Sequence, residues 1–188
     1  MGKKLILLGM AVAAVAAFAM PAAASASPVL TEGGTALAPG ATVIGTSTNA
    51  TTTNTALGTL KCAHVEITAN LEENTGSKIQ AKGTAGETAT CFAGTKELKV
   101  TKPTLVSLTT TGEDKGTLTL TFIADVTPFE CHFEGTGTFT YTTANDILTI
   151  PGISLTGPKF CLIEEVVKPT FHGTFTIRTA NGTPLEVK

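Results

Sequence analysis

Apolar and hydroxyl side chains alternate along three stretches of this chain, and this period of two constrains the fold more than any other feature. In residues 117–125, Leu118 and Leu120 share one face while threonines occupy the other, and residues 137–143 and 171–178 repeat the arrangement. Such alternation is typical of half-buried antiparallel strands. All 37 threonines lie at or after Thr31, and β-branched residues favour strands over helices. The sequence therefore predicts an all-β fold.

Turn signals divide the chain at regular intervals. Asn181-Gly182 and Asn145-Asp146 stand between apolar runs, and residues 112–116 join two further runs. Pro151-Gly152 interrupts a run whose inward parity changes across it, which predicts a β-bulge. Roughly ten to twelve short strands at this spacing predict an antiparallel β-sandwich or a Greek-key barrel.

The first 26 residues have the pattern of a secretory signal peptide. Lys3 and Lys4 precede an apolar run over residues 5–19, and Ala24-Ser25-Ala26 resembles a cleavage site. The run is shorter than the ~20 residues that a membrane-spanning helix needs. We therefore expect export, no transmembrane segment in the mature chain, and a secreted, extracellular or cell-envelope location.

The remainder predicts one domain. Residues 27–40 are rich in Pro and Gly and are expected to form a flexible lead-in to a single β domain over 41–188. The segments 137–145 and 173–181 match at seven of nine positions. This match has two interpretations, an internal duplication with halves of about 41–126 and 127–188, or repetition caused by a threonine-rich composition.

Four cysteines follow the leader, and an even number in an exported chain indicates two disulfides. Cys62 and Cys91 are 29 residues apart, and Cys131 and Cys161 are 30 apart. The near-equal spacing favours the local pairs Cys62–Cys91 and Cys131–Cys161 among three possible connectivities.

The mature chain also resembles a family of small exported actinobacterial proteins that are rich in Thr and Gly and contain four cysteines. The resemblance covers residues 29–187 and depends on strand openings and cysteines, namely Gly58-Thr-Leu-Lys-Cys62, Cys91, Phe129-Glu-Cys131-His-Phe-Glu-Gly135, Gly137-Thr-Phe-Thr140, Cys161 and Gly173-Thr-Phe-Thr176. It implies an exported, disulfide-bonded β domain, and the family provides no activity and no site residues.

Charge argues against polyanionic partners. Without Lys3 and Lys4 the chain has 11 basic and 15 acidic residues, and Arg178 is its only arginine. Nucleic-acid binding needs clustered Lys and Arg to displace counterions. We therefore expect neither nucleic acid nor an anionic membrane as a partner.

A polar stripe provides the candidate site. Alternation places Glu130, His132 and Glu134 on the outward face of one strand, about 7 Å apart in succession. Two carboxylates beside an imidazole suit either a small secreted hydrolase or a metal site, but no nucleophile accompanies them. The favoured interpretation is therefore a solvated polar face on one strand. His64 and His172 do not complete a metal-ligand spacing, so no metal or cofactor is predicted.

The favoured function is therefore a non-catalytic structural or binding protein, with an unidentified extracellular protein or envelope component as partner. The alternative is the hydrolase that uses His132 with Glu130 or Glu134. A more remote alternative is ice binding by an outward face of threonines, which sheet twist would disfavour.

Overall fold

The computed structural model describes residues 28–54, 58–76, 78–84, 89–93, 96–110, 114–126, 129–142, 145–157 and 168–187. The predicted leader, Cys161 and the side chains of Glu130 and Cys131 lie outside the described part of the structure.

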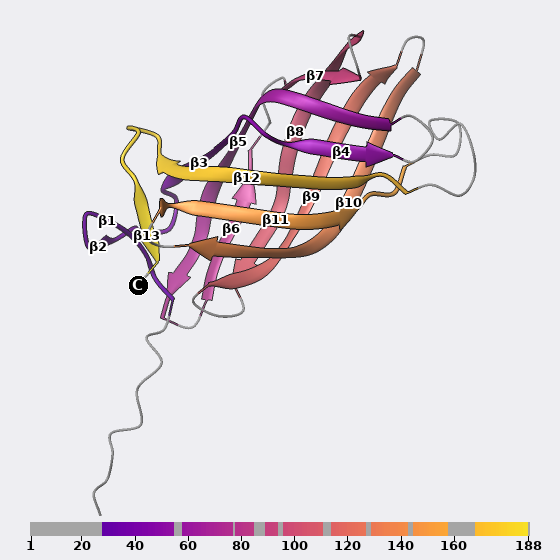
Figure 1. Ribbon diagram of the computed structural model, residues 1–188. Helices are drawn as coiled ribbons and strands as arrows, with labels where there is room; N and C mark the ends of the chain where they lie inside the picture. Colours follow the sequence, from indigo (N-terminus) through magenta and orange to yellow (C-terminus); the bar gives the residue numbers. More distant parts are fainter. Residues whose placement is uncertain are drawn as a thin grey trace, which may run out of the picture.

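Thirteen strands occupy the described residues (Figure 1). Their bounds are β1 Leu30–Glu32, β2 Thr35–Ala36, β3 Thr42–Ser47, β4 Thr51–Asn54, β5 Gly58–Thr75, β6 Lys78–Gly83, β7 Ala89–Ala93, β8 Lys96–Thr110, β9 Lys115–Val126, β10 Phe129–Thr142, β11 Ile147–Ser154, β12 Thr170–Thr179 and β13 Leu185–Val187.

Eight of these strands close into an antiparallel barrel. The order around it is β3, β5, β6, β8, β9, β10, β11 and β12, and β12 pairs with both β11 and β3. Each strand therefore pairs with the next barrel strand along the chain, which defines an up-and-down barrel. β4 pairs with β12 and β5 beyond the end of β3, and β7 pairs with β5 and β8 beyond the end of β6.

The all-β antiparallel prediction is confirmed, but the sandwich and the Greek-key connection are wrong. The strands are also more numerous than the ten to twelve predicted. Several are long, since β5, β8 and β10 have 18, 15 and 14 residues. Alternation marks which residues face inward, whereas closure depends on which strands pair at the two ends of the sheet. No periodic pattern in the sequence indicates that the first and last strands of the sheet pair with each other.

Local predictions agree with the structure where it describes them. Leu118 and Leu120 are buried on the inner side of β9, and the register of β11 against β12 shifts between Ile150 and Ile153, as the bulge prediction required. Gly182 has a φ of +83°, so the Asn181-Gly182 turn uses a conformation that glycine adopts without strain.

A second, three-stranded sheet covers one end of the barrel (Figure 1). It has the order β13, β1, β2, with Leu30 opposite Val187 and Thr31 opposite Ala36. We call β1, β2 and β13 the lid. Residues 30–32 and 35–36 therefore form paired strands within the segment expected to be a flexible lead-in.

The barrel end opposite the lid is filled by side chains. Ile153 and Leu155 are fully buried there, with Phe133 and Phe171 close to fully buried. A Cβ atom on Gly137 would lie 2.6 Å from Cγ1 of Ile153, so β10 needs glycine at this position to let β11 pack closely. The disulfide between Cys62 of β5 and Cys91 of β7 also lies in this region. It confirms one predicted pair, whereas the pairing of Cys131 with Cys161 stays a prediction.

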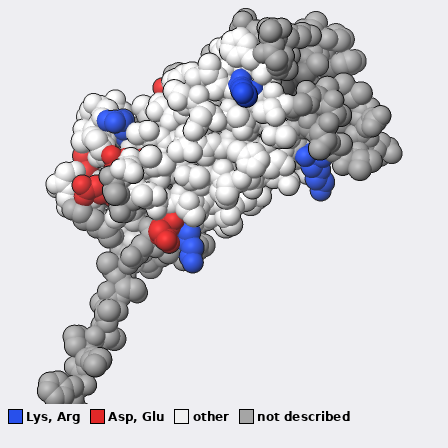
Figure 2. Space-filling view, in the orientation of Figure 1, with Lys and Arg blue, Asp and Glu red and all other residues white. Residues whose placement is uncertain are grey.

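The outer surface is hydroxyl-rich and sparsely charged. Thr140, Thr149 and Thr174 are cross-strand partners on β10, β11 and β12. The middle of the face in Figure 2, over β11 and β12, shows neither basic nor acidic side chains.

Candidate functional site

The half of the barrel beneath the lid contains a cavity of about 100 Å³. Its lining comes from all eight barrel strands and from Leu30 and Val187 of the lid. A single water molecule needs roughly 10–15 Å³, so this space exceeds an ordinary packing defect. Every barrel strand contributes side chains to its wall.

Small residues on three neighbouring strands explain why this half is hollow. Gly45 of β3, Ala69 of β5 and Ala81 of β6 line one wall. The opposite wall carries large side chains, including Phe139 and Tyr141 of β10. The small residues lie diagonally to one another, with Val43 opposite Ala69 and Leu71 opposite Ala81, and their small side chains fill less of the interior on this side.

The lining is almost entirely apolar. Its residues with polar side chains are Thr110, Lys115 and Tyr141. Thr110 Oγ1 accepts a hydrogen bond from the Ile79 amide at 2.9 Å, and the Tyr141 hydroxyl donates to the carbonyl oxygen of Leu185. Lys115 is exposed at the start of β9. These groups belong to the framework of the barrel and give the cavity no charged interior.

Tyr141 is held in its neutral form. Burial raises the pKa of its phenol well above the ordinary value, and the charges of Asp146 and Glu186 raise it further. A neutral phenol keeps its proton for the bond to Leu185 of the lid. The residue therefore connects the wall of the cavity to its cover without adding charge.

Asn74, near the end of β5, is the main polar link between barrel and lid. Its Oδ1 accepts from the Leu30 amide at 2.7 Å, and its Nδ2 donates to the carbonyl oxygens of Leu30 and Leu37, each at 2.8 Å. Thr179 Oγ1 adds a bond to Glu32 at 3.2 Å. The lid therefore sits over the cavity in a defined position.

The predicted polar stripe lies away from this cavity. His132 and Glu134 are exposed on the outer face of β10, opposite Ile123 and Thr121 of β9. Neither residue lines the cavity.

The remaining histidines lie on other strands of the outer surface. His64 Nε2 is 3.9 Å from Glu66 Oε2 on β5, and His172 Nδ1 contacts the Pro151 carbonyl oxygen at 2.5 Å. Within the described ranges, no group of three His, Cys, Asp or Glu residues has the geometry to hold a metal ion. The three histidines therefore do not form one site.

The cavity was not predicted from the amino-acid sequence. Its signal in the sequence is weak, because inward glycine and alanine at positions 45, 69 and 81 are also common in filled cores. Gly45, Ala69 and Ala81 come together in one wall only when β3, β5 and β6 pair. The register of that pairing places Val43 opposite Ala69 and Leu71 opposite Ala81.

Comparison with known proteins finds no matching family, no matching curated protein and no matching solved structure. In the part of the chain that the structure describes, no helix has the length and apolar character needed to cross a membrane.

Proposed function

We propose that this protein is an exported, non-catalytic binding protein that encloses a small, uncharged, hydrophobic molecule beneath the lid. The observation that carries the proposal is the apolar cavity of about 100 Å³ inside the barrel. Empty apolar cavities destabilise a fold by roughly 24 cal/mol per Å³. A void of this size therefore costs about 2 kcal/mol, and a bound ligand would recover that loss.

The chemistry of the wall selects for an uncharged occupant. Transfer of an unpaired charge into an apolar interior costs far more than burial of a hydrocarbon gains. Tyr141 and Thr110 already have hydrogen-bond partners within the protein. A water molecule in this space would find few polar partners.

The alternatives receive less support. A hydrolase would need its acid, base and nucleophile near a bound substrate, whereas His132 and Glu134 lie on the outer face of β10. The threonine face curves around a closed barrel, which disfavours the flat array that ice binding would use. Export is supported by the leader pattern and by the disulfide, which is compatible with an oxidising location.

Two matched pairs of compounds test the proposal. Naphthalene and 1-octanol are uncharged, whereas 2-naphthoate and octanoate have similar bodies with a carboxylate. We expect each uncharged compound to bind at least tenfold more tightly than its charged counterpart, measured by calorimetry and by thermal stabilisation of the protein. Absence of binding by both uncharged compounds would contradict the proposal.

A cavity-filling variant locates the binding. Ala81→Leu projects new bulk into the cavity and should weaken binding of naphthalene by at least tenfold without lowering the melting temperature substantially. The matched control is Ala63→Leu, because Ala63 is exposed on β5. Equal binding by both variants would place the ligand elsewhere on the molecule.

A further inference from the structure

The backbone pairing of the barrel wall is shortest between β6 and β8. The register of this pair contains only Gln80 opposite Thr109 and Ala81 opposite Leu108 in the described residues. By contrast, β9 and β10 stay paired from Val126 opposite Phe129 through to Lys115 opposite Thr140. We call the β6–β8 junction the seam.

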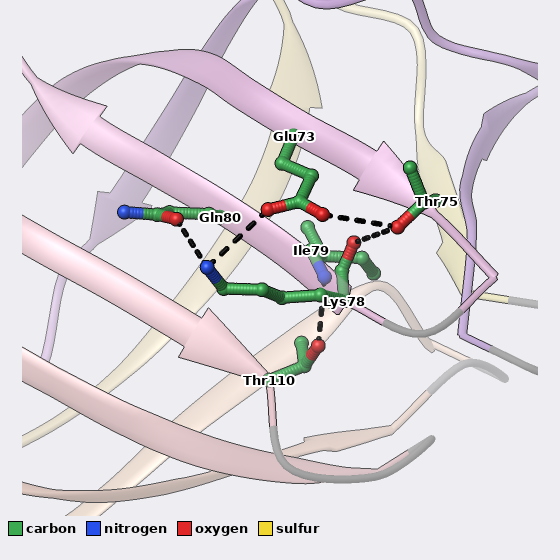
Figure 3. Close-up of polar contacts among 6 residues, drawn as sticks. All are labelled: Glu73, Thr75, Lys78, Ile79, Gln80 and Thr110. Carbon is green, nitrogen blue, oxygen red and sulfur yellow. Dashed lines mark hydrogen bonds and ion pairs between the residues drawn. The ribbon is translucent and has the colours of Figure 1, made fainter.

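At the lid end of the seam, a hydrogen bond to a side chain takes the place of a hydrogen bond between the two backbones. The Ile79 amide donates to Thr110 Oγ1 at 2.9 Å (Figure 3). The neighbouring polar contacts of β6 stay within the β5–β6 hairpin. Lys78 Nζ lies 3.3 Å from Glu73 Oε2 and 2.6 Å from Gln80 Oε1. Among the contacts in Figure 3, the Thr110 bond is therefore the one that crosses the seam.

The seam is tightly closed at its other end. A Cβ atom on Gly83 would lie 1.9 Å from the carbonyl oxygen of Leu105, so the two backbones are in direct contact there. Between this contact and Thr110, both sides of the seam line the cavity, with Ile79 and Ala81 on β6 and Leu108 on β8. Parting of β8 from β6 above Gly83 would widen the access from solvent to the cavity.

An apolar side chain stands outside the same strand segment. Val106 of β8 is 40 % exposed, and it is the one exposed large hydrophobic residue in the described part of the chain. It lies at the bulge between Leu105 and Ser107. A hydrophobic molecule that approaches the barrel here has a surface to contact before it reaches the interior.

We propose that the ligand enters and leaves the cavity through the seam, with Thr110 as the latch, and this inference rests on the proposed binding function. The lid is the competing route, but Asn74 ties Leu30 of β1 to β5 by two hydrogen bonds. Tyr141 and Thr179 add one bond each, to Leu185 and Glu32 of the lid. Because one side-chain hydrogen bond closes the lid end of the seam, the seam opens at lower cost than the lid does.

A disulfide across the seam tests the route. Directly opposite residues in antiparallel strands have Cα separations of about 4.5–5.5 Å, which a disulfide can span. The variant Gln80→Cys with Thr109→Cys should slow both association and dissociation of naphthalene at least tenfold in stopped-flow fluorescence. The equilibrium affinity should stay within twofold of that of the Gln80→Ser, Thr109→Ser reference.

Two further bridges serve as controls, and mass spectrometry confirms each one. Thr117→Cys with Thr138→Cys joins opposite residues of β9 and β10, and it should leave the rates unchanged. Thr31→Cys with Glu186→Cys joins β1 to β13 and prevents these two strands of the lid from separating. A slow exchange of naphthalene in the protein with the β1–β13 bridge, with normal rates in the seam-locked one, would overturn the proposal.

Hydrogen exchange tests the latch without any ligand. Thr110→Val removes the hydroxyl and keeps the shape, so the Ile79 amide should exchange at least tenfold faster by NMR. Thr109→Val on the same strand should leave it unchanged. If naphthalene fails to bind but Thr110→Val accelerates this exchange selectively, the binding function fails while the opening seam stands. Equal exchange in the two variants would refute the latch whatever binds.

Discussion

Tyr141 and Asn74 show how single residues join the cavity wall to its cover. The Tyr141 hydroxyl reaches the Leu185 carbonyl of β13, and the Asn74 amide satisfies three backbone groups near β1 and β2. The polar atoms of both side chains form hydrogen bonds at the lid, so the space beneath it stays apolar. This arrangement leads to two predictions at the scale of the residue.

The first concerns the ionisation of Tyr141, which is the only tyrosine in the chain. Its pKa in the folded protein is raised by burial and by Asp146 and Glu186. The stabilising effect is therefore complete below the unfolded-state pKa of about 10, and it is lost as pH rises above that value, because the unfolded state releases a proton that the folded state retains.

Absorbance at 295 nm should accordingly show no tyrosinate while circular dichroism still reports a folded barrel. The free energy of unfolding should fall above pH ~10 more steeply in the wild type than in Tyr141→Phe. At neutral pH the same variant should lose about 1 kcal/mol, the worth of one hydrogen bond. Titration of Tyr141 near pH 10 in the folded protein would refute this account.

The second prediction concerns Asn74. Replacement by Ala leaves the Leu30 amide and two carbonyl oxygens without their partner, and we expect a loss of about 2–3 kcal/mol in denaturant unfolding. Asn70→Ala is the matched control, because Asn70 is exposed on the same strand and bonds only to Thr42 in the described structure. Its effect should stay within about 0.5 kcal/mol, and equal losses in the two variants would refute the role of Asn74.

At the scale of the element, the short strands β6 and β7 are held in the barrel wall by pairing with β5 and β8. The β6 position of the barrel wall is interrupted and resumes as β7, which pairs with β5 and β8. Cys62 and Cys91 are directly opposite each other in the β5–β7 register, so their bond holds the short strand to the longest one.

Removal of that bond should be costly. The two cysteines are 29 positions apart in the sequence, and the double variant Cys62→Ser with Cys91→Ser should lose about 3–4 kcal/mol of unfolding free energy. Non-reducing peptide mapping of the wild type checks the pairing itself and also tests the predicted Cys131–Cys161 bond. A link between Cys62 and Cys161 would contradict both the structure and the sequence interpretation.

Repetition in the sequence acquires a structural meaning at this scale. Residues 137–142 of the first matching segment lie on β10 and residues 173–179 of the second lie on β12, and these strands flank β11. Phe139 and Phe175 occupy corresponding positions in the match, as do Tyr141 and Ile177, and all four line the cavity. The repeated motif thus builds two parts of the same apolar wall.

At the scale of the whole molecule, closure separates this protein from a sandwich. A sandwich with the same strands would bury its inner face between two sheets and leave edges exposed. The barrel instead pairs β12 with β3, which encloses a round interior. Bulky residues fill that interior at the disulfide end, and small residues leave it hollow at the lid end. Proposed function and access route both follow from this difference between the two ends.

The amino-acid sequence by itself determined the strand-forming character, the inward residues of β9, β10 and β12, the bulge after Ile150 and the Cys62–Cys91 pair. These properties depend on neighbours along the chain or on simple spacing, so a period of two, a proline or an even cysteine count is enough to reveal them. It placed the candidate site on the stripe Glu130, His132 and Glu134, since polar patterns along one strand are also visible locally.

Only the tertiary structure decided the closure of the barrel, the lid formed by the two distant segments β1–β2 and β13, and the cavity beneath it. Each of these depends on residues far apart in sequence. Gly45, Ala69 and Ala81 become one wall because their strands pair, and Asn74 meets Leu30 across 44 residues of chain. Packing between distant side chains decides where space remains, and no local pattern records it.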